Sequence, residues 1–291
     1  MTESINNRTL KKVVESLVSQ RNSKKKTDFE FEQGEFLQIP VQSGNSTENI
    51  ALYIEKAKKD LPGNPIVLFT HGDGESIDDY LGYGSTFCPH GVSFCVMDYR
   101  GTGYSDGSLN ASCALEKDDV ITVIKYLKST GFQKISYFGR SLGAMCGVYA
   151  AAEFPDLVCI AFDSGSINIK GLTIYQLNHF YHINTEEVER LYPEACRVIK
   201  EIYGIDFSAI QEPYVLAPKI TQPIFVIHGR KDQIVPISES ERLMELVQSQ
   251  EKQFVPFDGG HNDFSRYKYF IQQFLFILHH NGVDVTEDQL E

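Results

Sequence analysis

Several features that mark specialised classes of protein are missing from this sequence. It has no tryptophan, only 4 methionines, and 6 cysteines that are scattered without a C-x-x-C pair or a zinc-like spacing. No run of 18 apolar residues occurs, so no segment is long enough to cross a bilayer as a helix. The opening residues, MTESINNRTLKK, lack the apolar core of a signal peptide. We therefore expect no metal site, no stable membrane insertion and a reducing, cytoplasmic location.

The sequence also has fewer basic residues, 27 Lys and Arg, than acidic residues, 39 Asp and Glu. The formal net charge is -12 and the isoelectric point is about 5.2. Such a surface repels phosphate backbones, which argues against nucleic acid as a partner. The remaining composition, 42% hydrophobic and 23% charged, is that of an ordinary globular protein with one large core. The composition leaves the oligomeric state open.

Short apolar runs alternate with helical patterns along most of the chain. Runs rich in β-branched and aromatic residues predict strands at 35–41, 49–55, 65–70, 92–97, 134–138, 157–162, 223–227 and 253–257. Apolar residues at helical spacing predict helices around 120–127 and 264–278. Several of the strands are nearly continuous hydrophobes, as expected when both faces of a sheet are covered. The fold class is therefore α/β, with a mostly parallel central sheet and helices on both faces.

Two segments depart from this alternation. Residues 1–30 form a polar leader in which Leu10, Val13, Val14 and Leu17 are spaced as on an amphipathic helix, and residues 31–291 form the main domain. Residues 166–212 offer no strand and lie between two predicted strands, so we expect a helical insertion above the sheet that acts as a lid. The insertion is rich in aromatics, namely Tyr175, Phe180, Tyr181, Tyr192, Tyr203 and Phe207. These rings either face a substrate or fill the insertion's own small core.

The pentapeptide GRSLG at 139–143 is the first chemical signal. It follows a predicted strand and precedes a helical pattern of small residues, which is the context that the G-x-S-x-G arrangement requires. Gly139 and Gly143 let strand and helix approach closely, and the helix N-terminus favours developing negative charge. We predict that Ser141 is a nucleophile; the alternative is an ordinary tight turn.

A serine hydroxyl needs a base to take its proton, and that base needs a carboxylate to orient it. His261 follows a Gly-Gly turn at the end of a predicted strand and opens the last helix, which suits the base. Asp232 is the only carboxylate in the loop after the preceding strand. The order Ser, Asp, His is that of the α/β-hydrolases rather than of chymotrypsin or subtilisin. The rival acid is Asp163, at the end of the strand that follows the nucleophile helix.

Donors for an oxyanion complete the predicted site. One is the backbone N–H of Leu142, directly after the nucleophile, and the other is expected from the loop His71–Glu75, with the N–H of Asp73 as the choice. The alternative for His71-Gly72 is a simple turn after a strand.

Together these motifs resemble the α/β-hydrolase superfamily. Five motifs are similar to those of serine aminopeptidase-like hydrolases and abhydrolase-domain acyl-protein depalmitoylases. They are HGDG at 71–74, DYRGTGYS at 98–105, GRSLG at 139–143, HGRKD at 228–232 and GGHND at 259–263. The resemblance covers about 65–280 and implies the fold and the triad more than a substrate. Two departures stand out: the family often has an uncharged residue where Asp73 stands, and the Cys-rich N-terminus of the membrane-bound depalmitoylases is absent.

We therefore expect a serine hydrolase that cleaves an ester or thioester through an acyl-enzyme, without cofactor or metal. The substrate is a small molecule or an acylated protein, and the aromatic insertion favours an apolar acyl or alcohol group. The alternatives are a peptidase or amidase of aminopeptidase type and a non-catalytic scaffold with a hydrolase fold.

Overall fold

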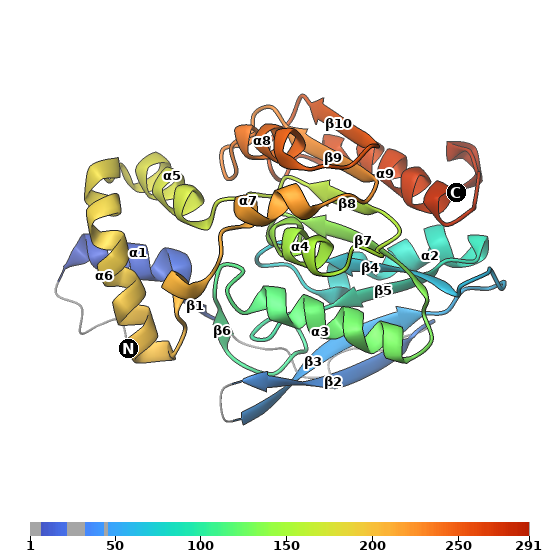
Figure 1. Ribbon diagram of the computed structural model, residues 1–291, viewed down its shortest axis with the longest axis horizontal. Helices are drawn as coiled ribbons and strands as arrows, with labels where there is room; N and C mark the ends of the chain where they lie inside the picture. Colours follow the sequence, from blue (N-terminus) through green and yellow to red (C-terminus); the bar gives the residue numbers. More distant parts are fainter. Residues whose placement is uncertain (1–6, 22–32, 44–45, 291) are drawn as a thin grey trace.

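The computed structural model describes residues 7–21, 33–43 and 46–290, and a sheet of eight strands forms its centre (Figure 1). The strand order is β10-β9-β8-β7-β4-β5-β3-β2. The strands are β2 (Glu35–Ser43), β3 (Ser46–Glu55), β4 (Pro65–Thr70), β5 (Ser93–Met97), β7 (Lys134–Arg140), β8 (Ile160–Asp163), β9 (Ile224–Gly229) and β10 (Lys252–Phe257). From β10 to β5 neighbouring strands are parallel, and β3 and β2 are added antiparallel. The predicted mostly parallel sheet is confirmed, although β8 begins three residues later than the predicted 157–162.

Helices cover both faces of this sheet, as Figure 1 shows. One face carries α3, α4 and α8, and the other carries α2 and α9, so two apolar cores form, one on each side. These helices are α2 (Gly84–Phe87), α3 (Glu116–Ser129), α4 (Leu142–Glu153), α8 (Ser238–Leu246) and α9 (Tyr267–His280). The helices predicted around 120–127 and 264–278 correspond to α3 and α9.

The central strands are buried along their whole length, which explains their continuous hydrophobic sequence. Every residue of β4, β5, β8 and β9 is buried. Helix α4 lies especially close to the sheet. A Cβ on Gly147 of α4 would stand 2.5 Å from the rings of Tyr137 and Phe162, so only glycine permits this approach.

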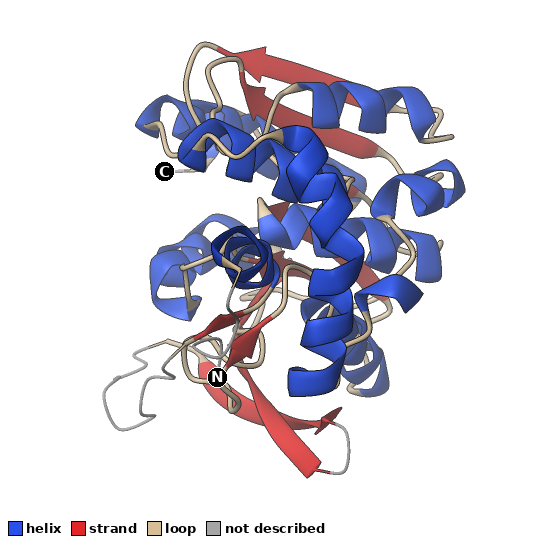
Figure 2. Cartoon of the chain, turned by 90° about the vertical axis from the view of Figure 1, so that its left-hand side faces the viewer, coloured by secondary structure: helices blue, strands red, loops and turns tan. Residues whose placement is uncertain are grey.

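The insertion between β8 and β9 begins with two helices at one end of the sheet, on the left of Figure 1 and facing the viewer in Figure 2. Helices α5 (Ile169–Tyr181), α6 (Thr185–Tyr203) and α7 (Pro213–Leu216) make up the insertion between β8 and β9. Helix α1 (Arg8–Leu17) packs against α5 and α6, and its apolar face of Leu10, Val13, Val14 and Leu17 is buried there. We call α1, α5 and α6 the helical cap. The lid role stays a prediction.

The described part of the leader continues from α1 into a short strand that sequence patterns did not predict. Strand β1 (Ser19–Gln20) pairs antiparallel with β6 (Leu109–Asn110). This two-stranded ribbon ties the leader to the loop between β5 and α3. The rest of the predicted leader, residues 1–6 and 22–30, lies outside the described residues.

The strand order diverges between β4 and β7, because the strands after β4 and after β7 are added on opposite sides. In open α/β sheets, ligands bind beyond the carboxyl ends of the strands at such a switch point. The loop after β4 begins at His71 and the turn after β7 begins at Ser141, so both predicted motifs meet there.

Candidate active site

Ser141 occupies a strained turn between β7 and α4. Its backbone has φ 51° and ψ -109°, a conformation that residues other than glycine rarely adopt. A Cβ on Gly139 would stand 2.5 Å from the carbonyl oxygen of Gly143, and a Cβ on Gly143 would overlap the carbonyl oxygen of Thr70. Both predicted glycines are therefore required by close approach, and the turn presents the Ser141 hydroxyl at the carboxyl edge of the sheet.

The structure brings Ser141, His261 and Asp232 into one hydrogen-bonded chain. His261 Nε2 lies 3.0 Å from Ser141 Oγ, and His261 Nδ1 lies 2.6 Å from Asp232 Oδ2. The imidazole comes from the loop after β10 and the carboxylate from the loop after β9. With Nδ1–H donated to the carboxylate, the lone pair of Nε2 faces the hydroxyl, as a general base requires.

Asp232 is held as an ionised acceptor. Its other oxygen, Oδ1, accepts the backbone N–H groups of Ile234 and Val235, each at 2.8 Å. Burial alone would raise its pKa, but hydrogen bonds from His228 and His261 outweigh this, so the pKa of Asp232 lies well below its usual value.

His228 is a site residue that sequence reasoning missed. Its Nε2 lies 3.3 Å from Asp232 Oδ2 and 2.9 Å from the carbonyl of Val235, and its Nδ1 lies 2.7 Å from Ser240 Oγ. The side chain is fully buried. The sequence did carry a signal for His228, because a histidine is unusual near the end of a buried strand and stands four residues before the predicted acid.

The rival acid, Asp163, lies in a different environment. Its carboxylate accepts the Ser164 hydroxyl at 2.8 Å and faces Arg140 Nε at 3.4 Å. Its backbone carbonyl accepts the N–H of Ser141 at 2.7 Å, which helps to hold the turn. The hydrogen bond to His261 is made by Asp232, so the geometry favours the predicted acid over Asp163.

The predicted oxyanion donors lie on the two sides of Ser141. Leu142 is the first residue of α4, so its N–H has no acceptor within the helix. Within the described residues, no hydrogen bond engages the N–H of Asp73. The Asp73 carboxylate turns to Arg21 Nη2 at 2.5 Å and Asn110 Nδ2 at 3.3 Å, which offsets a charge that would oppose an oxyanion.

A cavity of about 150 Å³ opens beside Ser141. It is lined by Ser16, Asp73, Asn110, Ser112, Ser141, Leu142, Met145, Ser166, Leu172, Gln176, Ile234 and Val235. The helical cap contributes Ser16 from α1 and Leu172 and Gln176 from α5. Seven of these residues are polar and five are aliphatic, and no aromatic side chain of the insertion is among them, so the cavity does not support the alternative in which those rings face a substrate. Phe180 and Tyr181 are exposed in the last turn of α5, beyond Leu172 and Gln176 along the helix.

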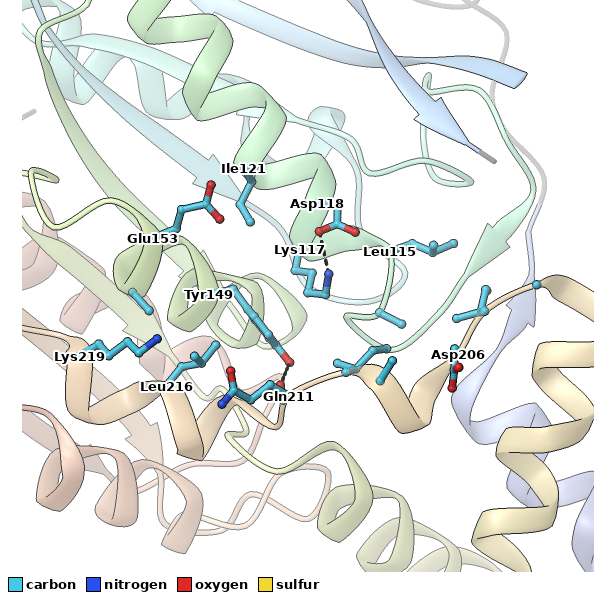
Figure 3. A pocket seen from close by; sticks show the side chains of 16 residues that line it. Leu115, Lys117, Asp118, Ile121, Tyr149, Glu153, Asp206, Gln211, Leu216 and Lys219 are labelled. Carbon is cyan, nitrogen blue, oxygen red and sulfur yellow. Dashed lines mark hydrogen bonds and ion pairs between the residues drawn. The ribbon is translucent and has the colours of Figure 1, made fainter. Parts of the chain in front are cut away.

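A wider groove of about 680 Å³ lies away from this chemistry, between α3, α4 and the segment that joins α6 to α7 (Figure 3). Tyr149 donates its hydroxyl to the carbonyl of Gln211 at 2.6 Å there, and Lys117 pairs with Asp118 at 2.7 Å. None of the predicted site residues lines the groove. Size alone therefore does not locate the reactive centre.

In residues 7–21, 33–43 and 46–290, no three His, Cys, Asp or Glu side chains are grouped so as to hold a metal ion. No helix among these residues is long and apolar enough to span a bilayer.

A serine, an aspartate and a histidine that follow one another in this order along the chain, and that form one hydrogen-bonded chain at the switch point of a mostly parallel sheet, are typical of serine hydrolases of α/β fold. The family profile described as "Serine aminopeptidase, S33" matches residues 62–194, and the profile described as "Serine hydrolase (FSH1)" matches residues 172–262. The chain is thus similar to serine hydrolases, and it has the α/β-hydrolase fold, as the motifs predicted.

Two curated relatives and one solved structure illustrate the similarity. The Bacillus subtilis protein YqkD is 26% identical over 199 residues, which cover 67% of this chain and 64% of that protein. The bovine mitochondrial palmitoyl-protein thioesterase ABHD10 is 30% identical over 174 residues, covering 56% of this chain and 55% of that protein. The matched region thus spans less than two thirds of these relatives. The Pyrococcus furiosus esterase Pf2001 superposes with a TM-score of 0.61 at 16% identity, over 85% of this chain and 91% of that one, and shares the fold.

Proposed function

We propose that the protein hydrolyses a carboxylic ester or thioester with Ser141 as the nucleophile. Ser141 Oγ attacks the carbonyl carbon while His261 Nε2 accepts the hydroxyl proton. The imidazolium then gives this proton to the departing alcohol or thiol, which leaves an ester between Ser141 and the acyl group. Water attacks the acyl carbon as His261 takes its proton, and the carboxylic acid departs when that proton returns to Ser141.

The observation that carries this proposal is the continuous chain of 3.0 Å and 2.6 Å hydrogen bonds from Ser141 through His261 to Asp232. The ionised carboxylate stabilises the imidazolium that forms in each step. The N–H groups of Leu142 and Asp73 serve as oxyanion donors, each worth a factor of about 10² to 10³ in rate.

The small size of the cavity supports a short acyl group. A volume of about 150 Å³ is below the roughly 300 to 1,000 Å³ that is typical of pockets for larger ligands. The side chains of Leu142, Met145 and Leu172 offer apolar contacts to such a group, and Gln176 adds a polar one. The acyl group is carried by a small molecule or by an acylated protein.

The peptidase alternative finds less support. An aminopeptidase needs a carboxylate that is free to bind the substrate amine, and the carboxylate that lines this cavity, Asp73, is already paired with Arg21. The scaffold alternative is disfavoured because Ser141, His261 and Asp232 lie within hydrogen-bonding distance in one chain. A cytoplasmic location stays a prediction, supported by six cysteines that are all buried free thiols.

A fluorophosphonate probe tests the proposal directly. We expect the wild-type protein to be labelled and the Ser141→Ala protein to remain unlabelled. p-Nitrophenyl esters graded from acetate to palmitate, matched thioesters and aminoacyl anilides then identify the bond, with Ser141→Ala as the blank. A folded wild-type protein without labelling refutes the proposal, and faster cleavage of anilides than of esters favours the peptidase.

A further inference from the structure

The arginine that precedes the nucleophile is buried beneath the candidate site. Arg140 ends β7, and only 4% of its surface is exposed. It pairs in register with Asp163 of β8, whose carboxylate lies 3.4 Å from Arg140 Nε. Two residues earlier on the same face of β7, Phe138 packs against Phe270 of α9. Strand alternation therefore aims Arg140 at the face of the sheet that carries the His261 loop.

The guanidinium of Arg140 holds the backbone from which the imidazole projects. Its Nη2 donates to the carbonyl oxygen of His261 at 3.2 Å and to Asn262 Oδ1 at 2.6 Å. Arg266 Nη1 reaches the same carbonyl at a longer 3.4 Å. The backbone of His261 is thus hydrogen-bonded to Arg140, which directly precedes Ser141, although 121 positions separate His261 and Arg140 in sequence.

The other end of the guanidinium holds the loop that carries the proposed oxyanion donor. Arg140 Nη1 forms an ion pair with Glu75. Glu75 Oε2 accepts the N–H of Gly72 and the hydroxyl of Tyr80, each at 2.7 Å, and Gly72 directly precedes Asp73. A Cβ on Gly72 would stand 3.0 Å from both Arg140 Nη1 and Glu75 Oε2, so the loop lies directly on the ion pair.

The charge state of Glu75 fits this role. Burial would raise its pKa, but the Arg140 charge and the hydrogen bonds from Tyr80 and Gly72 prevail, so the pKa of Glu75 lies below its usual value. Glu75 therefore stays ionised and keeps accepting from the loop.

We propose that Arg140 is a positioning residue that sets the distances among the Ser141 hydroxyl, the His261 imidazole and the oxyanion loop. One planar guanidinium with five donors joins all three segments, which a lysine ammonium cannot do with the same geometry. This inference rests on the proposed function. Misplacement of the reacting groups affects the transition state more than substrate binding, so we expect a loss in kcat with little change in KM.

The test compares Arg140→Lys with a matched control, Arg100→Lys. Arg100 is also buried, with 5% exposed, and also forms a salt bridge with a buried carboxylate, Asp119. It makes no hydrogen bond to Ser141 or His261 among the described residues. Both substitutions remove a buried guanidinium, so a merely structural role predicts similar losses of melting temperature and similar activities in the two folded proteins.

Two measurements are made on the folded full-length proteins. The first is the rate of Ser141 labelling by the fluorophosphonate, together with kcat and KM on the best ester. We expect about a 10- to 100-fold lower labelling rate and kcat for Arg140→Lys and less than about a threefold change for Arg100→Lys. The second is the proton NMR signal of His261 Nδ1–H, which should broaden or shift in Arg140→Lys and stay in place in Arg100→Lys.

A second variant guards against failure to fold. Asn262 is exposed, so Asn262→Ala is expected to fold, and it removes one of the two bonds between Arg140 and the histidine loop. We expect about a three- to tenfold lower labelling rate for Asn262→Ala. In the double variant with Arg140→Lys, the two losses should not multiply, because both substitutions act on the same contact. A wild-type labelling rate in Asn262→Ala overturns the inference if Arg140→Lys does not fold.

The two proposals fail in different ways. An unlabelled wild-type protein refutes the hydrolase function, and the His261 signal then decides the positioning role by itself. A labelled wild-type protein whose Arg140→Lys variant keeps its labelling rate and His261 signal, or loses no more than Arg100→Lys, overturns the Arg140 inference and leaves the hydrolase function intact.

Discussion

Replacement of Asp232 by asparagine should convert the candidate base into the wrong tautomer. Oδ1 of Asp232 accepts two backbone N–H groups, from Ile234 and Val235, each at 2.8 Å. An asparagine must keep its carbonyl oxygen there, because an NH₂ group would meet two donors. Its NH₂ group is then placed at the position of Oδ2, which lies 2.6 Å from His261 Nδ1. Nδ1 must become an acceptor, so Nε2 carries the proton and no longer accepts one from Ser141.

The magnitude follows from the loss of the general base while the geometry is kept. We expect kcat to fall about 10⁴-fold, which corresponds to about 5.5 kcal/mol of transition-state stabilisation. The assay is steady-state hydrolysis of a short p-nitrophenyl ester, with circular dichroism to show that Asp232→Asn is folded. Burst kinetics distinguish slow acylation from slow deacylation.

Asp163→Asn is the matched control for this prediction. It also replaces a buried carboxylate near the candidate site, but one whose partners are the Ser164 hydroxyl and Arg140. We expect no more than about a tenfold loss of kcat, the effect of one weakened hydrogen bond to a charged group. The tautomer argument is refuted if Asp232→Asn retains a tenth of the wild-type kcat, or if Asp163→Asn loses as much as Asp232→Asn.

Three further predictions concern the turn, a buried acid and the leader. Gly143→Ala should lower the labelling rate by about 10²-fold or more, because its Cβ would overlap the carbonyl of Thr70 and displace the nucleophile; probe kinetics check this, and an unchanged rate contradicts the close-approach argument. Burial raises the pKa of Glu116 from 4.5 to about 7, so the folded state binds a proton more tightly than the unfolded state; the free energy of unfolding should fall by about 3 kcal/mol as pH rises from about 4.5 to 7. Urea titrations near both pH limits should show a fall that is about 3 kcal/mol larger in the wild-type protein than in Glu116→Gln, because Asp119, whose pKa burial raises to about 6, contributes to the slope in both proteins; equal slopes would refute the linkage. Arg21→Gln should lower kcat/KM by no more than about fivefold at low salt and less at high salt, because the ion pair with Asp73 is partly exposed, and Asp73→Asn in the same background should restore it.

The helical cap shows which structural features a sequence pattern predicts and which it leaves open. Helical spacing in the leader predicted an amphipathic helix, and α1 buries the four apolar residues concerned. The pattern carried no information on where α1 docks, which is against α5 and α6 at the edge of the Ser141 cavity. The aromatic content of the insertion left two alternatives, rings that face a substrate or rings that fill the insertion's own core, because composition does not determine which side chains reach a cavity.

The parts of the candidate site that local chemistry dictates were readable from the sequence alone. A strained turn needs small residues at fixed offsets, so Gly139, Ser141 and Gly143 stand within five positions, and buried parallel strands need continuous hydrophobes. The roles of His261 as base and Asp232 as orienting acid could be predicted because each residue follows a predicted strand.

Only the tertiary structure decided that Arg140 joins Glu75 to the histidine loop, that His228 supports Asp232, and that Arg21 neutralises Asp73. Most of these partners are far apart in sequence, 65 positions for Arg140 and Glu75, and 52 for Arg21 and Asp73. A periodic pattern indicates which residues share a face of one helix or strand, because the local backbone angles determine the direction of successive side chains. Which faces meet is determined by the packing of the whole chain, and no local pattern records that.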